Sequence, residues 1–550
     1  MKKSKLTPIL TSLLALLLCT GCYEDEGNYN YNEDIKDINV KLDPSYGVRK
    51  QDGKMSVTIP PEITTEDGDK SYLEYLWEQR TRSETDYQVD TVCRTETYTL
   101  EVDTQAEDFS ANYYLRLYVF NKRTGAQTVV PTRVEFVNPY TYAWMVLHET
   151  NGHAEIGAIE YVAGKMIVTP NAYSSEHGEA LNGRPINMTI TKNKSTNWAN
   201  KAYRSQLYVT TDNLEESGPM DFTDKFKLLA PWSKLVHETQ AAEIDFTKIS
   251  DWDACNNSGL VVCSQGKIFH NGYYSPFMFK MNPATTLTKE YYIKQFAAGP
   301  HTAVGYDIKG HRFLHIALQS SEFWAGFEPT QVYNGGPIEP MNQREGNAID
   351  PTRIDPEVNI IRFVNGYHYD MNYPARWQRY QCYAYGLTPD NTSQVYVIRY
   401  YNLTHADGVT IPEFYEFPTP AGINENTPMT SGAKYNNILF YGVDNKVYKL
   451  DVSTGTSTLI YQNENTSAKV VDLKMAMEGY AWSDDTESMG EEDYGHPYCR
   501  LLGVAINTGN NKGEVVVLQL NTAGKVDENK QYPSIQIHTG FGPITEIGFI

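Results

Sequence analysis

Short runs of alternating apolar and polar residues dominate the first part of the chain. Within residues 113–120, Leu115, Leu117 and Val119 fall on one face of an extended strand, and the intervening residues fall on the other. Similar strand-like runs, separated by turn residues, occupy 37–42, 55–60, 72–79, 97–103, 112–121 and 132–137. Closely spaced short strands without a helical pattern predict an all-β fold that begins with an immunoglobulin-like β-sandwich over residues 35–139, with Trp77 in its core.

Residues 140–550 repeat a different unit, in which polar turns and Thr-Gly turns connect three or more strands. The clearest copy is 436–462, and further copies occupy 258–281, 359–372, 394–418 and 498–524. Asn151-Gly152, the preferred pair for a type I′ turn, joins two strands of the first unit. Recurrence about every 40–50 residues predicts a β-propeller of about seven blades. Two β-sandwich or barrel domains in tandem remain the alternative.

Asn138-Pro139 is the predicted boundary between the sandwich and the propeller. The last residues, 542–550, read as one more strand. We expect this strand to close the ring beside the first blade.

The N-terminus has a different pattern from the rest of the chain. Three lysines precede an apolar stretch from Leu6 to Leu18, and Thr20-Gly21-Cys22 follows it. This layout predicts a secretory signal peptide over residues 1–21, because the apolar stretch is too short to span a bilayer. A cysteine at the cleavage position resembles a bacterial lipoprotein signal, in which Cys22 carries the lipid, although Cys19 stands where such signals usually carry Leu. An uncleaved, buried helix is the alternative.

Residues 22–34 are polar and acidic and predict a tether rather than a folded element. The whole chain has a formal net charge of −21, and removal of three lysines with residues 1–21 makes it −24. Such a charge argues against nucleic acid as a partner and against a basic membrane-binding face.

The cysteines do not suggest a disulfide framework or a metal site. Apart from Cys19 and Cys22 they are Cys93, Cys255, Cys263, Cys382 and Cys499, widely scattered and without a CxxC pair. We therefore expect buried free thiols, no zinc motif and no cofactor.

Several candidate chemical sites fail on their spacing. His148 and His153 lie five residues apart around a hairpin turn, whereas the zincin motif needs histidines four apart on a helix. His311 and His315 read as strand residues too far apart to hold one ion. The acidic run 484–493 suits Ca²⁺ chemically, but its spacing favours a solvated loop. No catalytic motif is present, although paired carboxylates for glycoside hydrolysis are defined in space and not in sequence.

Exposed aromatic residues are the better candidates for ligand binding. The candidates lie in loop-like surroundings and are Trp324, Trp377, Trp482, Tyr273 and Tyr274. Aromatic rings on loops stack on sugars or grip peptide side chains. The alternative is that these rings fill gaps between blades.

The opening CYEDEGNYNYNED, the predicted sandwich and the β-rich region from YAWMVLHETNG to TGFGPITEIGFI together resemble the PKD-like family lipoproteins of Bacteroidota. The acidic residues 23–26 also resemble the signal that sends such lipoproteins to the extracellular face of the outer membrane. The resemblance implies a non-enzymatic accessory subunit of a nutrient-uptake complex. Its partners would be a SusC-type TonB-dependent transporter, a SusD-type lipoprotein and an oligosaccharide or peptide ligand. A surface hydrolase or lyase, or a stand-alone adhesin, remains the alternative.

Overall fold

The computed structural model divides the chain into two compact units, Met1–Val137 and Asn138–Ile550. It describes residues 38–82, 87–107, 109–140, 143–162, 165–190, 206–236, 241–255, 259–270, 278–281, 290–299, 302–318, 337–368, 379–400, 409–432, 435–476, 500–527 and 533–550. Strands dominate these ranges, with the short helix α2 (Ala172–His177) and the 3-10 turns η2 (Trp232–Lys234) and η3 (Phe246–Lys248). No helix among these residues is long and apolar enough to cross a bilayer.

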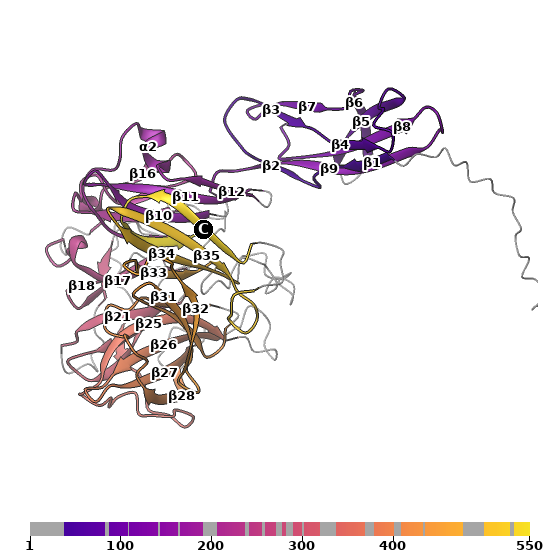
Figure 1. Ribbon diagram of the computed structural model, residues 1–550. Helices are drawn as coiled ribbons and strands as arrows, with labels where there is room; N and C mark the ends of the chain where they lie inside the picture. The colour runs from indigo at the N-terminus through magenta and orange to yellow at the C-terminus, as the bar shows by residue number, and fades with distance from the viewer. Residues whose placement is uncertain are drawn as a thin grey trace, which may run out of the picture. The chain divides into compact units, whose positions relative to one another are not determined.

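The described strands of the first unit form a five-stranded sheet and two strand pairs (Figure 1). The five-stranded sheet has the order β2-β9-β8-β5-β6, and the pairs are β1-β4 and β3-β7. The strands are β1 (Ile38–Lys41), β2 (Tyr46–Arg49), β3 (Lys54–Ile59), β4 (Glu62–Thr65), β5 (Leu73–Arg82), β6 (Tyr87–Cys93), β7 (Tyr98–Asp103), β8 (Asn112–Asn121) and β9 (Gln127–Val137).

The core of this sandwich follows from the alternation along β8. Leu115, Leu117 and Val119 are buried, and Leu117 lies opposite Trp77 of β5. Trp77 is fully buried, and its indole N–H donates a hydrogen bond to the carbonyl oxygen of Thr95 at 3.1 Å. The one polar atom of this side chain is therefore satisfied, as burial requires. The predicted β-sandwich with Trp77 in its core is confirmed.

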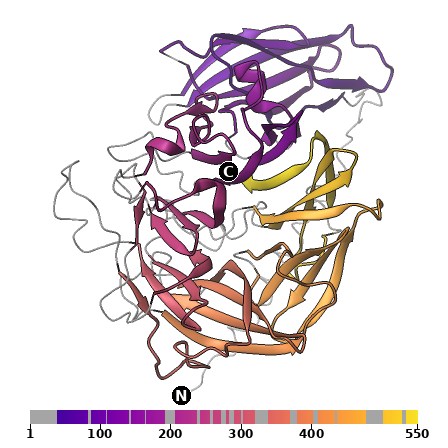
Figure 2. The ribbon, with the colours of Figure 1, turned by 90° about the vertical axis from the view of Figure 1, so that its left-hand side faces the viewer.

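Within the described residues, the second unit consists of seven four-stranded antiparallel sheets arranged in a ring (Figure 2). We number these sheets as blades 1 to 7. From the inner to the outer strand, blade 1 is β37 (Ile544–Phe549), β10 (Ala143–Thr150), β11 (His153–Val162) and β12 (Lys165–Thr169), and blade 2 is β13 (Pro185–Ile190), β14 (Gln206–Thr211), β15 (Pro219–Asp221) and β16 (Lys227–Leu228). Blade 3 is β17 (Ile249–Cys255), β18 (Gly259–Ser264), β19 (Lys267–His270) and β20 (Phe279–Lys280), and blade 4 is β21 (Ile293–Ala298), β22 (Thr302–Asp307), β23 (Arg312–Ala317) and β24 (Ile338–Pro340). Blade 5 is β25 (Asn359–His368), β26 (Arg379–Leu387), β27 (Thr392–Tyr400) and β28 (Val409–Pro418), and blade 6 is β29 (Met429–Thr430), β30 (Ile438–Val443), β31 (Lys446–Asp451) and β32 (Thr456–Gln462). Blade 7 is β33 (Lys469–Met475), β34 (Leu501–Gly509), β35 (Lys512–Gln519) and β36 (Ile535–Phe541).

The last strand of the chain closes the ring. β37 pairs antiparallel with β10, and Trp144 lies opposite Phe549 in this register. Figure 1 shows the yellow C-terminal strand beside the purple strands of blade 1. The predicted β-propeller of about seven blades and the closing role of residues 542–550 are therefore confirmed, and tandem sandwiches or barrels are excluded.

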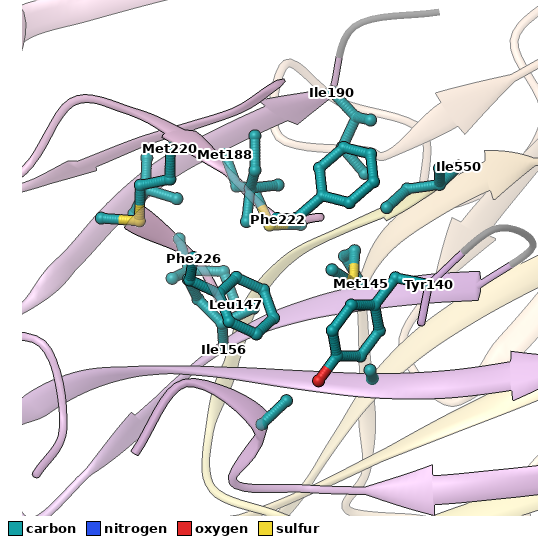
Figure 3. Close-up of a cluster of buried hydrophobic side chains, with 14 of the residues drawn as sticks. Tyr140, Met145, Leu147, Ile156, Met188, Ile190, Met220, Phe222, Phe226 and Ile550 are labelled. Carbon is teal, nitrogen blue, oxygen red and sulfur yellow. The ribbon is translucent and has the colours of Figure 1, made fainter. Parts of the chain in front are cut away.

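Apolar side chains fill the spaces between neighbouring blades. Between blades 1 and 2, buried residues of β10, β11, β13, β15 and the C-terminus form one cluster (Figure 3). An added Cβ at Gly548 would lie only 2.6 Å from Ile190, so glycine allows the inner strands β37 and β13 to approach closely. This packing, at ~25 cal/mol per Å² of apolar surface, is the main force that holds blades together.

The two faces of the ring are built from different connections. We call the face where the inner strands begin the upper face, and the opposite one the lower face. Because neighbouring strands in a blade are antiparallel, the turns between second and third strands lie on the upper face. These turns are tight and contain left-handed residues such as Asn151 (φ 53°), Asn391 (φ 67°) and Asp444 (φ 50°). The predicted Asn151-Gly152 hairpin is one of them.

Candidate functional site

The inner strands share a short motif that was not recognised from the sequence. At their first or second residue, six of them start a run of an apolar residue, any residue, a polar residue and a second apolar residue. The copies are PINM (185–188), ISDW (249–252), IKQF (293–296), IIRF (360–363), VVDL (470–473) and ITEI (544–547). The polar position is therefore Asn187, Asp251, Gln295, Arg362, Asp472 or Glu546.

A β-bulge accompanies each copy of the motif. In blades 1, 2, 3, 4, 5 and 7, the register of the inner strand against the second strand shifts at or just before the polar position. In blade 3, for example, Ile249 pairs with Ser264, but the next paired residue is Asp251. A bulge bends the strand and re-aims the following side chain. The recurring bulge explains how polar residues occupy equivalent positions round the ring.

Three of these polar residues bind the backbone of the next blade. Asp251 accepts a hydrogen bond from the Phe296 N–H at 2.9 Å, which links blades 3 and 4. Asp472 accepts one from the Ile547 N–H at 3.0 Å, which links blades 7 and 1. In each case the donor is the apolar residue directly after the polar position.

Glu546 repeats the same arrangement between blades 1 and 2. Its carboxylate accepts a hydrogen bond from the Met188 N–H at 2.7 Å. The amino group of Lys474 lies 3.9 Å from the other carboxylate oxygen of Glu546. Each of these links joins a side chain of one blade to the backbone of the next, so each contributes to ring closure.

Other polar contacts run from the inner strand of blade 5 to neighbouring or opposite parts of the ring. The amide of Asn365 in blade 5 donates to Asp253 in blade 3 at 2.9 Å. Arg362 of blade 5 donates through Nε to the carbonyl oxygen of Thr427, just before blade 6, at 3.0 Å. The axis is therefore crossed by hydrogen bonds, not lined only by apolar side chains.

Charges of both signs are concentrated at this axis. The carboxylates are Asp251, Asp253, Asp472 and Glu546, and the cations are Arg362 and Lys474; together we call them the axial cluster. Asp251, Asp472 and Glu546 are half-buried, and the Glu546 side chain is 19% exposed. Among the described residues, this cluster therefore combines four carboxylates with two cations.

Burial is the largest contribution to the pKa values of three axial carboxylates, and it raises them. It raises the pKa of Asp251 to about 7, although the hydrogen bond from Phe296 opposes the shift. It raises the pKa of Glu546 to about 8 against the attraction of Lys474, and the Asp472 charge adds to the rise. Burial also raises the pKa of Asp472, with Lys474 again opposing. Desolvation penalises the charged form of a carboxyl group, and nearby carboxylates do the same.

A second polar network lies on the lower face between blades 5 and 6. Glu413 of β28 forms an ion pair with Arg399 of β27 and accepts hydrogen bonds from the Tyr415 hydroxyl at 2.5 Å and the Asn437 side chain at 3.2 Å. The Asn437 backbone N–H donates to the Tyr383 hydroxyl at 2.8 Å. Burial alone would raise the pKa of Glu413, but Tyr415 and Arg399 outweigh it and hold the pKa below its usual range.

The sequence-predicted site residues lie outside the described residues. This holds for Cys22, for the acidic run 484–493 and for the candidate aromatic residues Trp324, Trp377, Trp482, Tyr273 and Tyr274. The described strands that flank these aromatics are β19 and β20, β23 and β24, β25 and β26, and β33 and β34. Each pair consists of an inner strand and a second strand, or of a third strand and a fourth. Inner and third strands end on the lower face, and second and fourth strands begin there, so all these flanking strand ends lie on the lower face.

The histidine candidates have ordinary structural roles. His148 is buried, and its ring contacts the Pro170 carbonyl oxygen at 2.8 Å and the Gly542 N–H at 3.1 Å. His315 lies in β23 as predicted. His311 does not, because it occupies a left-handed turn (φ 48°) before the strand begins. Cys263 and Cys382 are buried free thiols, as expected, whereas Cys93 is free but only partly buried. Burial raises the pKa of Cys263 to about 12.

One protein-family model matches the first part of the chain. Residues 22–185 match the model of the PKD-like family. No curated protein matches the chain. Among solved structures, a quinonprotein alcohol dehydrogenase-like protein from Bacteroides thetaiotaomicron is 12% identical with a TM-score of 0.39, and the match covers 92% of this chain and 96% of that one.

Two further structural neighbours are more distant. An ancestral GH74 enzyme is 9% identical with a TM-score of 0.34, over 79% of this chain and 51% of that one. The WD40 domain of SCAP from fission yeast is 12% identical with a TM-score of 0.25, over 66% and 74% of the two chains. Such distant likenesses carry no inference about activity.

Proposed function

We propose that this protein is a lipid-anchored lipoprotein on the extracellular face of the outer membrane. It would capture or hand over an oligomeric nutrient, a glycan or a peptide, as an accessory subunit of a SusC/SusD-type TonB-dependent uptake complex. The observation that carries the proposal is Cys22. A signal-like segment precedes this cysteine, and the match to the PKD-like family begins at the same residue.

Anchoring gives this assignment a physical basis. Acyl chains on Cys22 would confine the protein to the membrane plane without a spanning segment. Confinement raises the effective concentration of the protein beside a transporter in the same membrane, so a weak contact suffices for assembly. The polar residues 22–34 would act as the tether between the lipid and the sandwich.

The geometry of the ring favours binding over catalysis. In the axial cluster, Asp251, Asp472 and Glu546 already bind backbone N–H groups of neighbouring blades. These contacts give the carboxylates a role in ring closure that requires no substrate. Loops held by a rigid scaffold are the usual carriers of binding. The described strands that flank the candidate aromatics in sequence have their adjoining ends on the lower face.

The experiment is a pull-down from the native outer membrane in mild detergent. The affinity tag belongs in the exposed turn at Thr124-Gly125, because Ile550 is 8% exposed and packs into the core between blades 1 and 2. We expect the tagged protein to recover a TonB-dependent transporter and its lipoprotein lid. Recovery of the tagged protein alone at native expression level contradicts the proposal.

Two variants separate the parts of this proposal. Cys22→Ala should release the protein from the membrane fraction and abolish recovery of the transporter, and unchanged membrane retention would contradict lipid anchoring. Joint replacement of Trp324, Trp377 and Trp482 by Ala should weaken nutrient capture but leave the assembly intact. Turnover of glycans or peptides by the purified wild type would favour the hydrolase or lyase alternative.

A further inference from the structure

The outer strands of the seven blades differ in how their edges are protected. The backbone of an edge strand can pair with another chain, and proteins prevent this with short strands, charged residues or proline. In blades 1 to 5 each outer strand contains a charged residue, and in blades 2, 3 and 4 it is only two or three residues long. The outer strand of blade 5 also contains proline. These five edges are therefore protected against pairing.

The outer strands of blades 6 and 7 lack these protections. β32 and β36 have seven residues each, and none of these is Asp, Glu, Lys, Arg or Pro. Burial lowers the pKa of His538 in β36, so this imidazole adds no charge near neutral pH. Among the described residues, β32 pairs only with β31, and β36 pairs only with β35.

Exposed apolar side chains distinguish β36 from β32. Ile535 and Ile537 lie two residues apart, on one face of β36, and are 43% and 55% exposed. β32 has one large apolar residue of this kind, Leu459, which is 47% exposed. Within the described part of the ring, β36 therefore combines an uncharged edge with two exposed isoleucines.

The backbone of β36 directs its outward groups from the same two residues. The Gln519 N–H donates to the carbonyl oxygen of Ser534 at 2.9 Å, so Ser534 faces β35. Successive residues of a strand direct their N–H and C=O groups to opposite sides. Gln536 therefore faces β35 as well, whereas Ile535 and Ile537 direct their N–H and C=O groups away from it.

The charge of the chain favours a second copy as the partner for this edge. The formal net charge is −21, so two copies repel each other over most of their surface. A two-fold axis brings the same strand of both copies together. A charged outer strand, such as that of blade 5, would then meet a like charge, whereas β36 has no charge near neutral pH that would repel its equivalent.

Antiparallel pairing of two β36 strands satisfies both the backbone and the side chains. With the two-fold axis at Gln536, Ile535 of one copy lies opposite Ile537 of the other. The outward N–H and C=O groups of these isoleucines then form the hydrogen bonds of an antiparallel ladder. Their side chains form two apolar cross-strand pairs, which stabilise a sheet.

We propose that this protein forms a two-fold symmetric dimer through β36, in which the seventh blades of two copies join into one eight-stranded sheet. The dimer requires neither the lipid on Cys22 nor a nutrient. Two linked rings would bind an oligomeric ligand with higher avidity than one ring. This gain in avidity rests on the function proposed above, whereas the dimer itself does not.

The first test is analytical ultracentrifugation of the full chain over a range of protein concentrations. The Cys22→Ala variant is used, so that no lipid holds two copies in one micelle. It should show a monomer–dimer equilibrium. Adding Ile537→Lys should leave the monomer alone, because a lysine on an edge strand blocks pairing. Leu459→Lys, at an exposed site of the other uncharged outer strand, is the control and should leave the dimer intact.

Three results overturn the proposal. They are a monomer at every concentration, a dimer that Ile537→Lys leaves unchanged, and a dimer that Leu459→Lys abolishes equally. An unchanged thermal midpoint should confirm that Ile537→Lys folds, since this side chain is exposed. A monomeric protein that loses the transporter in the pull-down when Ile537 is replaced by Lys would assign the edge to the transporter instead of a second copy.

Disulfide cross-linking tests the pairing of the two strands. Ile535→Cys and Ile537→Cys are prepared separately in a Cys93→Ser background, because Cys93 is a free thiol that is only partly buried. Opposite residues of an antiparallel ladder have Cα atoms about 5.5 Å apart, within the range of a disulfide. A mixture of the two variants should therefore form a disulfide-linked dimer under mild oxidation. Absence of this dimer, or equal linkage in a mixture of Leu459→Cys with Ile537→Cys, overturns the proposed pairing.

Discussion

Both units of this chain carry exposed ion pairs, but the ring also places charges at its axis. In the sandwich, charged residues pair on the surface, as in Lys41 with Glu62, whose side chains are 79% and 76% exposed. In the ring, Lys474 and Glu546 face each other at the axis with exposures of 34% and 19%. Exposed pairs contribute little to stability, whereas enclosed charges must be satisfied or neutralised. The polar positions of an alternating strand therefore lie in solvent in the sandwich, whereas on the inner strands of the ring they lie at the partly buried axis.

The largest expected effect concerns the independence of the two units. Trp77→Ala should destabilise the sandwich by about 3–5 kcal/mol, because it empties a fully buried site. Trp144→Ala, at a fully buried site of blade 1, should cost the ring a similar amount. Calorimetry should show that each variant lowers the transition of its own unit only. A shift of both transitions in either variant would contradict the independence of the two units.

An intermediate effect is expected at the network on the lower face. Glu413→Gln should destabilise the ring by about 1.5–3 kcal/mol near neutral pH, because hydrogen bonds to a charged acceptor are lost. The pKa of Glu413 is lowered in the folded chain, so its contribution is present above the ordinary carboxyl pKa and disappears as the pH falls through the folded value. Denaturant unfolding at about pH 7 and about pH 3 measures this difference. Glu62→Gln in the sandwich is the exposed control and should change neither value.

The smallest expected effect concerns a single turn of the ring. Gly152 has a φ of 83°, in the left-handed region. Gly152→Ala should cost about 1 kcal/mol, because a Cβ is disfavoured there although nothing else lies within 4 Å of it. Gly157→Ala in the adjacent strand should cost more, since its Cβ would lie 2.6 Å from Phe541. Equal effects of the two changes in denaturant unfolding would contradict the extra cost expected from the contact with Phe541.

Much of the fold could be predicted because its signals are local. Alternation along Leu115, Leu117 and Val119 identified the sandwich core, and Asn151-Gly152 identified a turn of the first blade. The strand at 542–550 was recognised from its pattern, and its pairing with β10 needed only the propeller rule that a ring must close.

The axial cluster could not be predicted in the same way. Asp251 and Asp472 occupy polar positions that look solvent-facing in an alternating strand. Only ring closure between segments far apart in sequence encloses them. The recurring apolar-x-polar-apolar motif was a usable signal, because its six copies fall at the start of inner strands. The aromatic ligand-binding residues remain a prediction, since they lie outside the described residues.

The claim that the ring, unlike the sandwich, holds protons on enclosed carboxyl groups is tested most directly by infrared spectroscopy. The carbonyl band of a protonated carboxylic acid should be visible in the full chain at about pH 6, where ordinary Asp and Glu side chains are ionised. The band should be weaker in the variant that combines Asp251→Asn with Glu546→Gln, which keeps only Asp472 of the three carboxyl groups with raised pKa values. A wild-type spectrum without this band at about pH 6, or an undiminished band in the double variant, would contradict the account.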